Sequence, residues 1–315
     1  MAIFTYALNA PVPDACRSAV LTIGNFDGVH VGHQALLVEA ANQARQRVCS
    51  SIAVTFDPHP SQLLRPEGVQ PFLTTIEDRT ALLQQHGIDH VLILQTSLPL
   101  LQLSAREFFE RIIVQLLQAK ALVEGFNFAF GKGREGTIDL LRDLCTEKKM
   151  PLTLMPPCEV RGAPVSSSRV RTDLLAGEVD RVCQLLGRSY RITGIVGTGQ
   201  KRGASLGFPT ANLHGIATLL PGDGVYAVQA IHAGKAYPAA ANIGPNPTFG
   251  ENARKAEVHL LGFTGNLYEQ SLSVDFIKKV RDTKAFNGAA ELMQQIRADI
   301  EEVKRIIPCD SSCDS

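Results

Sequence analysis

The hydrophobic pattern of the chain changes near residue 186, and this change constrains the fold more than any other feature. Before it, short apolar runs alternate with longer amphipathic segments, a rhythm typical of strands separated by helices. After it, short β-rich stretches follow one another closely, with turns such as HAGK and FTGN between them. The chain has 315 residues, enough for two domains. We therefore expect one domain over residues 1–186 and a second over residues 187–315.

The first domain is expected to be an α/β fold on a parallel sheet. Apolar runs predict strands at residues 18–24, 51–56, 89–94, 121–124 and 152–155. Helices are predicted at residues 34–47, and after Thr75 and Ser104, where the sequence offers amino-terminal caps. Strands that alternate with helices form right-handed crossovers and lie parallel. Such sheets bind ligands beyond the carboxyl ends of their strands.

The second domain is expected to be a small antiparallel β-barrel with a carboxyl-terminal helix. Its strands are predicted at residues 190–196, 224–231, 237–243, 256–263 and 271–277. The helix is predicted at residues 287–306, with an apolar stripe that can cover the barrel. The stripe consists of Leu292, Ile296, Ile300, Val303 and Ile307.

Composition narrows the class of protein. Lys plus Arg and Asp plus Glu both total 31, so the formal net charge is zero, which argues against a general nucleic-acid binder. The sequence shows neither a run of about 18 apolar residues nor a signal peptide, so no membrane span is expected. Five of the seven cysteines lack metal-type spacing, which favours reduced thiols in a cytoplasmic protein; these are Cys16, Cys49, Cys145, Cys158 and Cys183. For Cys309 and Cys313, in a polar tail, a frayed terminus is favoured over a metal or redox site.

The string GNFDGVHVGH, residues 24–33, leaves the first predicted strand and enters the first predicted helix. That place combines the carboxyl edge of the sheet with a helix amino end, where unpaired N–H groups favour anions. The glycines let the backbone approach a ligand. His30 and His33 add ring donors, and an imidazole with its ordinary pKa of about 6.5 can carry positive charge. The alternatives are a plain polar loop and a metal site, for which His59 is the nearest further ligand.

Several strings resemble one enzyme family. H-x-G-H after the first strand resembles the signature of the α/β nucleotidyltransferases, whose second signature, a serine/threonine and basic loop, corresponds to VSSSRVR at residues 165–171. With TFDPHP at residues 55–60 and GFNFAFGKGREG at residues 125–136, the first half is similar to the FMN adenylyltransferase module of the bifunctional riboflavin kinase/FAD synthetases. The second half resembles their riboflavin kinase module in LGFPTANL at 206–213, NIGPNPTF at 242–249 and EVHLLGFTGNLY at 257–268.

The resemblance implies a Rossmann-like nucleotidyltransferase domain in which the FMN phosphate attacks the α-phosphorus of ATP. His30 and His33 would contact the ATP phosphates and act in catalysis. Since the attacking phosphate is already ionised, positioning and charge neutralisation would carry the step. The further residues predicted to bind ATP are Gly24, Asn25, Asp27, Asn127, Ser167, Ser168 and Arg171.

In the kinase half, no GxxxxGK[ST] string is present, and a glycine-rich loop at residues 194–207 would hold the phosphates through backbone amides. Thr210 and Asn212 offer hard oxygen ligands for Mg²⁺ bound with ATP. Glu257 would accept the proton of the attacking riboflavin hydroxyl. Without the resemblance, Glu257 would be interpreted as an exposed acidic residue on a strand, and Asn212 as a turn residue. The further predicted ATP contacts are Gly199, Lys201 and Gly207.

The resemblance thus predicts an enzyme that converts riboflavin to FMN and FMN to FAD and pyrophosphate, with ATP as the second substrate of both steps. One rival, an adenylyltransferase for another phosphate, leaves the second half unexplained. Another, a non-catalytic flavin or nucleotide sensor, has to explain why the predicted catalytic residues are intact. Two departures are Ser168, where the family has threonine, and Asn127, where many relatives have aspartate. The sequence gives no indication of oligomeric state or of the relative rates.

Overall fold

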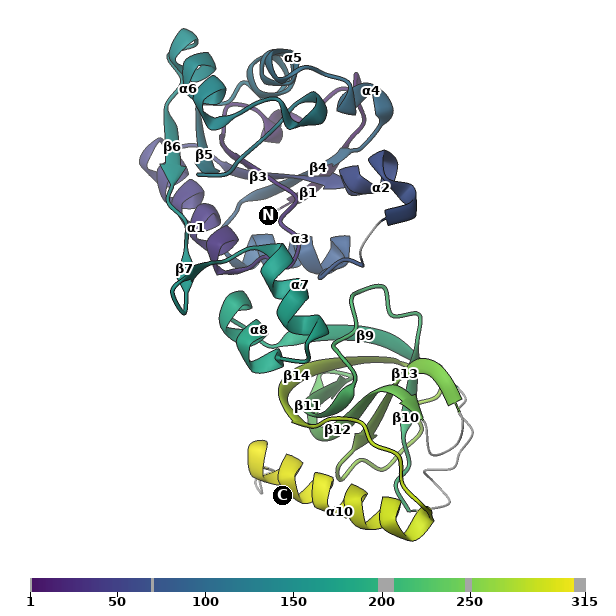
Figure 1. Ribbon diagram of the computed structural model, residues 1–315. Coiled ribbons are helices and arrows are strands. Elements are labelled where there is room, and N and C mark those ends of the chain that lie inside the picture. Colours follow the sequence, from purple (N-terminus) through teal and green to yellow (C-terminus); the bar gives the residue numbers. More distant parts are fainter. Residues whose placement is uncertain (1, 69–70, 198–206, 247–250, 309–315) are drawn as a thin grey trace. The chain divides into compact units, whose positions relative to one another are not determined.

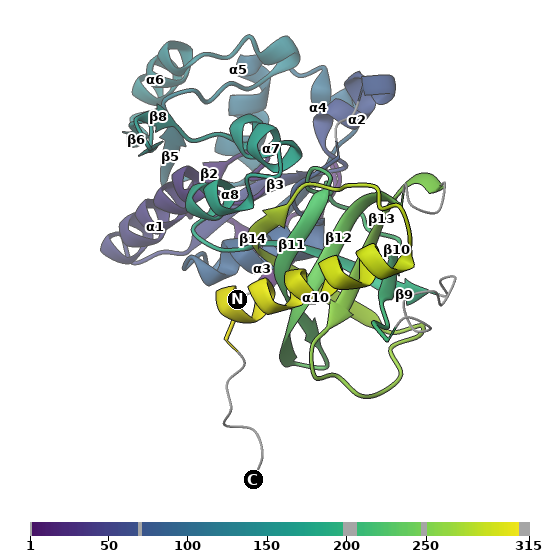
Figure 2. The same cartoon turned by 60° about the horizontal axis from the view of Figure 1, so that its bottom comes forward.

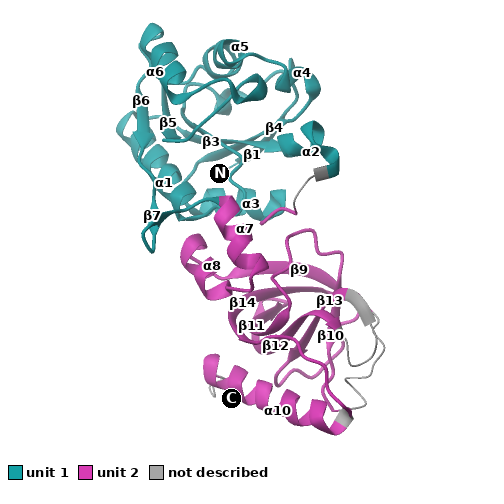
Figure 3. Cartoon of the chain, in the orientation of Figure 1, with its two compact units in different colours: residues 1–70, 74–166 teal, residues 71–73, 167–315 magenta. Residues whose placement is uncertain are grey.

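The chain forms two compact units in the computed structural model (Figure 3). The sheet unit comprises Met1–Gln70 and Thr74–Ser166, and the barrel unit comprises Pro71–Leu73 and Ser167–Ser315. The structure describes residues 2–68, 71–197, 207–246 and 251–308.

The expected domain boundary at residue 186 differs from the boundary between these units. The helices α7 (Ser167–Leu175) and α8 (Val179–Leu186) belong to the barrel unit. They do so because α8 packs against two barrel strands, β9 (Tyr190–Gly197) and β14 (Ser271–Arg281), and α7 packs against α8.

The sheet unit contains a parallel sheet with the strand order β1-β4-β3-β2-β5-β6 (Figure 1). Five of its strands were predicted, and all neighbouring strands run parallel, which confirms the expected α/β class. The edge strand β1 was not predicted, because its residues alternate between half-buried and exposed and form no apolar run. The strands are β1 (Ala2–Tyr6), β2 (Val20–Ile23), β3 (Ser51–Asp57), β4 (His90–Gln95), β5 (Ala121–Gly125) and β6 (Leu152–Met155).

Helices follow most of these strands. Both predicted caps are present: Thr75 Oγ1 accepts the Asp78 N–H at 3.1 Å, and Ser104 forms a capping box with Glu107. The α-helices are α1 (Val31–Gln46), α2 (Pro60–Leu64), α3 (Ile76–Gln85), α4 (Leu98–Leu101), α5 (Ala105–Phe108) and α6 (Ile138–Glu147). The remaining elements are the short helices η1 (Asp14–Cys16), η2 (Pro66–Gly68) and η4 (Lys132–Arg134), the π-helix η3 (Phe109–Leu116), and the strand pair β7 (Glu159–Val160) and β8 (Ala163–Pro164).

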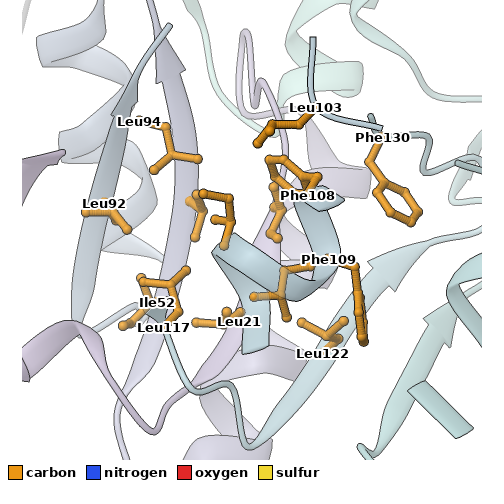
Figure 4. Packing of buried hydrophobic residues seen from close by; sticks show 14 of the residues in the cluster. Leu21, Ile52, Leu92, Leu94, Leu103, Phe108, Phe109, Leu117, Leu122 and Phe130 are labelled. Atoms are coloured by element: carbon orange, nitrogen blue, oxygen red, sulfur yellow. The ribbon is translucent and has the colours of Figure 1, made fainter. Parts of the chain in front are cut away.

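Each face of the sheet is covered by an apolar cluster. On one face, residues of α1 and α3, such as Leu37 and Leu83, pack against the sheet. On the other face, a larger cluster joins sheet residues to Phe108 and Phe109 and to residues of α6 (Figure 4). Burial on both faces explains why the central strands read as continuous apolar runs in the sequence.

The barrel unit contains the predicted antiparallel barrel, which is closed and has the strand order β10-β13-β12-β11-β14-β9; the short strand β10 was not predicted. The helix α10 (Ala289–Ile306) packs against β11, β12 and β14 and covers them (Figure 2). It is also tied to the barrel by an ion pair between Asp299 and Arg281 at 2.8 Å. The strands not yet given are β10 (Ala211–His214), β11 (Gly224–His232), β12 (Lys235–Asn246) and β13 (Glu251–Leu260).

Two expectations from composition can be compared with the described residues. Within them, no helix combines the length and apolar character needed to cross a membrane. The five cysteines in the described ranges form no disulfide, while Cys309 and Cys313 lie outside those ranges.

Candidate functional site

The loop between β2 and α1, residues 24–30, has an unusual backbone and is called the histidine loop below. Phe26, Gly28 and Val29 have φ angles of +49°, +82° and +40°. For a β-branched residue such as Val29, a positive φ is a genuine outlier. Such strain persists only where surrounding structure enforces it, and it concentrates at functional sites. Here Phe26 and Val29 are fully buried in the apolar cluster under α1, which holds the strained loop in place.

Asp27 holds the histidine loop from inside the protein. Its Oδ1 accepts the N–H and the hydroxyl of Thr74, both at 3.1 Å, and lies 3.6 Å from Nη2 of Arg79. Thr74 Oγ1 in turn accepts the N–H of Gly28 at 3.2 Å. Asp27 and Arg79 are almost fully buried. Asp27, predicted as an ATP contact, therefore has an internal ion-pair and hydrogen-bond network that shapes the loop.

His30 and His33 lie together at the amino end of α1. Nδ1 of His30 accepts the N–H of His33 at 3.2 Å, so His30 is the N-cap of the helix. The two rings stack, with centroids 3.6 Å apart and planes 13° from parallel. Because Nδ1 of His30 is an acceptor, the proton of its neutral ring is on Nε2, which remains available as a donor.

Burial changes the charge expected for both histidines. It lowers the pKa of His30 from its ordinary 6.5 to about 4, although a hydrogen bond with the backbone of His30 itself and the charge of Asp27 oppose the shift. Burial also lowers the pKa of His33 well below its ordinary value, helped by His30 and Arg79. Both shifts favour neutral rings at pH 7, whereas an imidazole with its ordinary pKa can carry positive charge. They can still donate hydrogen bonds.

His59, the further ligand considered for a metal site, has a different role. Its Nδ1 accepts the N–H of Ser61 at 3.1 Å, and Gln62 completes a capping box at the start of α2. Over the described ranges, no group of three or more His, Cys, Asp or Glu side chains is arranged to hold a metal ion.

Three other predicted residues of the sheet unit follow the carboxyl ends of neighbouring strands. Gly24 follows β2 and donates its N–H to the Val54 carbonyl at 3.0 Å, while Asn25, with an exposed side chain, accepts the Thr55 hydroxyl through its carbonyl at 3.3 Å. Asn127 follows β5, and its side chain is exposed. Since β2 pairs with β5, Asn127 shares the carboxyl edge of the sheet with the histidine loop.

The predicted basic loop is helical. Ser167, Ser168 and Arg171 lie in the first two turns of α7, and Nε of Arg171 donates to the Pro71 carbonyl at 3.3 Å. A helix forms here because Val170 and Leu174, one turn apart, bury their side chains completely. These residues belong to the barrel unit, so their closing over phosphates at the histidine loop stays a prediction.

In the barrel unit, strand register brings the predicted kinase residues together. Glu257 on β13 lies opposite Asn212 on β10 and, on its other side, opposite Asn242 on β12. Directly opposite residues have their Cβ atoms about 4.5–5.5 Å apart and point to the same face of a sheet. Their neighbours along the strands, such as Ala211 and Val258, are buried in the barrel, so this row of polar side chains lies on the outer face.

The turn before β10 is anchored to β13, the strand that carries Glu257. His259 donates through Nδ1 to the Pro209 carbonyl at 2.7 Å, and its ring meets Phe208 edge-on. This fixes Thr210, whose side chain is exposed, one residue before β10. Gly207 has a φ of +86°, which favours glycine. Gly199 and Lys201 lie outside the described residues.

Four residues at these sites were assigned no role from the sequence. Thr74 and Arg79 were not linked to Asp27, because they lie about fifty residues away and carry no motif of their own. Asn242 was quoted as part of a family string without a role. Glu124, a fully buried acid in β5, accepts the Ile23 N–H at 2.9 Å. An acid within the apolar string ALVEG was the available signal for it.

Comparisons with known proteins agree with the division of the predicted site residues between two parts of the chain. A family model described as FAD synthetase matches residues 12–169, and one described as riboflavin kinase matches residues 186–307. The chain is 38% identical to a bifunctional riboflavin kinase/FMN adenylyltransferase of Pseudomonas fluorescens, over 92% of this chain and 93% of that protein. It is 34% identical to a protein of the same name from Bacillus subtilis (strain 168), over 91% and 92% of the two chains.

One solved structure resembles the chain over nearly its whole length. It is a Streptococcus pneumoniae protein named as a macrolide-efflux protein, with a TM-score of 0.84, 30% identity, and coverage of 96% of this chain and 99% of that one. The match supports the fold, although the name of that protein agrees with neither family model. Both family models and the relatives that span the chain lead to one assignment. The chain belongs to the family of bifunctional riboflavin kinase/FMN adenylyltransferases.

Proposed function

We propose that the two activities of the family reside in different units of this chain. The barrel unit phosphorylates riboflavin with ATP to give FMN. The sheet unit joins AMP from a second ATP to FMN, giving FAD and pyrophosphate. The observation that carries this assignment is the match of the two family models to different stretches of the chain, 12–169 and 186–307.

In the sheet unit, the histidine loop would bind the ATP phosphates. The neutral His30 ring donates from Nε2, and the amino end of α1 adds N–H groups and a partial positive charge. Neutral donors suffice here, since hydrogen bonds that strengthen as charge builds on the phosphate lower the barrier. The FMN phosphate is an ionised nucleophile, so alignment with the α-phosphorus replaces a general base.

The other predicted residues of the adenylyltransferase would have distinct roles. Asp27 acts through the shape of the histidine loop, because its contacts are with Thr74 and Arg79. Gly24, Asn25 and Asn127 would contact the nucleotide at the carboxyl edge of the sheet. Ser167, Ser168 and Arg171 would reach the ATP phosphates from the amino-terminal turns of α7.

In the barrel unit, Glu257 would take the proton from the terminal hydroxyl of riboflavin. Thr210 and Asn212 would hold Mg²⁺ bound with ATP, and the register of β10 with β13 supports a row of oxygen donors that suits this hard cation. When bound, Mg²⁺ neutralises phosphate charge during transfer. The glycine-rich loop with Gly199, Lys201 and Gly207 would cover the phosphates.

One incubation tests the assignment. Purified protein is mixed with riboflavin, ATP and MgCl₂, and the flavins are separated over time. FMN is expected first and FAD after it, with neither formed when Mg²⁺ is chelated. Flavin binding without any product would favour the sensor, whereas adenylylation of another phosphate compound but not of FMN would favour the rival adenylyltransferase.

A further inference from the structure

Glu124 is a carboxyl group that the proposed reaction does not use. It is the fourth residue of β5, is 1% exposed, and accepts the main-chain N–H of Ile23 on β2 at 2.9 Å. Ile23 is the last residue of β2, so the histidine loop begins immediately after this bond. The acid therefore contacts the one strand that leads into the proposed phosphate site.

The bond replaces a main-chain contact between the two strands. β2 pairs with β5 at Val20 and Leu21, and the pairing stops there. The N–H groups of Val20 and Gly24 point to the other neighbour of β2, so alternation directs the N–H of Ile23 toward β5. At that position the Glu124 side chain, and not the β5 backbone, accepts the bond. The two strands therefore separate where parallel sheets of this kind open to bind ligands.

The surroundings of Glu124 are apolar. Side chains alternate along a strand, so Glu124 points to the same face as Leu122, which lies in the larger apolar cluster (Figure 4). Burial raises the pKa of the Glu124 carboxyl well above its usual value, and the Ile23 N–H opposes this only in part. Cys145 of α6 lies in the same cluster, where burial raises the pKa of its thiol to about 11.

We propose that Glu124 is a positioning residue of the adenylyltransferase, whose carboxyl holds the end of β2 and thereby fixes the start of the histidine loop. This inference rests on the proposed assignment of FMN adenylylation to the sheet unit. If the end of β2 shifts, the donors of His30 and His33 leave their places relative to the nucleotide. A misplacement of about 1 Å at such a site can cost about 10²-fold in rate.

The test compares variants of nearly equal shape. Glu124→Gln keeps an oxygen that can accept the Ile23 N–H, whereas Glu124→Met has the same length without an acceptor. The initial rate of FAD formation from supplied FMN is measured for each, with kcat and KM separated. We expect the Met variant to lose about 10- to 100-fold in kcat with KM for ATP little changed. The Gln variant should stay within about twofold of the wild type, because it restores the hydrogen bond.

Riboflavin phosphorylation by the same samples is the internal control, since it belongs to the barrel unit. Should the Met variant melt near the assay temperature, Glu124→Asp replaces it, because the shorter acid withdraws its oxygen from Ile23 without removing the polar group. The proposal is overturned if the Met or Asp variant keeps the wild-type kcat, or if Gln loses as much as Met. Absence of FAD formation by the wild type would instead overturn the proposed function, and the role of Glu124 in that function would be overturned with it.

Discussion

The two units hold their reacting groups in different ways. In the sheet unit, the histidines lie at the end of a strained loop. The buried ion pair between Asp27 and Arg79 stabilises this loop from inside the protein. In the barrel unit, Glu257 and Asn212 project from regular strands whose register places them side by side. A site on a loop therefore depends on the buried side chains that support the loop, whereas a site on strands depends on the pairing of those strands, here β10 with β13. Four predictions test this contrast.

Replacing both histidines should separate the two activities. In His30→Ala/His33→Ala, FAD formation should fall by about 10³-fold or more, because two donors to the phosphates are removed at once. FMN should still accumulate from riboflavin, since the kinase residues are in the other unit. The measurement is chromatographic separation of the flavins over time. His59→Ala, which removes the cap of α2, is the control that should retain FAD synthesis. Equal loss of FMN and FAD in a folded double variant would contradict the two-site assignment.

Glu257→Gln should affect only the kinase. A positioned general base contributes about 10²–10⁴-fold, so riboflavin turnover should fall within that range. Riboflavin and ATP affinity should change little, because the amide keeps the shape of the side chain, and FAD synthesis from supplied FMN should be nearly normal. Turnover within a few-fold of the wild type would mean that Glu257 is an acidic residue on a strand and does not act as the general base.

Breaking the buried ion pair should destabilise the sheet unit. Asp27→Ala leaves Arg79 buried without its carboxylate, and such changes cost about 3–5 kcal/mol in the free energy of unfolding. Denaturant unfolding followed by circular dichroism, with kinase activity tracked in parallel, measures the effect. The double variant Asp27→Ala/Arg79→Met should recover part of the loss. Asp139→Ala, which removes a solvent-exposed ion pair with Arg142, is the matched control and should change little. A similar loss in both single variants would contradict a special role for the buried pair.

Acid should weaken the sheet unit through its histidines. The pKa of His30 is about 4 in the folded chain and about 6.5 when unfolded, so the unfolded state binds more protons in this range. Stability is therefore lost as the pH falls from about 6.5 to 4, by up to roughly 3 kcal/mol from this residue. His30→Asn keeps a good N-cap and removes the titration, so its acid-dependent loss should be smaller by about that amount. Thermal unfolding of both proteins between pH 7 and pH 4 measures this loss. An identical pH dependence of the two proteins would show that His30 is not buried as described.

Much of the fold could be predicted because it depends on local patterns. The five strands β2 to β6 of the sheet are apolar runs, Ser104 and Glu107 are three residues apart in a capping box, and the apolar stripe of α10 repeats with the helical period. The edge strand β1 and the short β10 have no such pattern, and only their partners β4 and β13 make them strands. The helix α7 was expected as a loop, because its packing on α8 is not visible in the string VSSSRVR.

The residues of both candidate sites were also present in the sequence as motifs, but their chemical state was not. The motif identifies His30 and His33. Burial lowers the pKa of both rings, and the neighbouring Arg79 lowers that of His33 further, so neutral rings are favoured. Asp27 was predicted to bind ATP, and its pairing with residues about fifty positions away could not be predicted from the motif. Local patterns reflect the hydrophobic period and the caps, which act over a few residues. Desolvation and ion pairing depend on which distant segments meet, so the tertiary structure alone sets the charge of the histidines and the support of their loop.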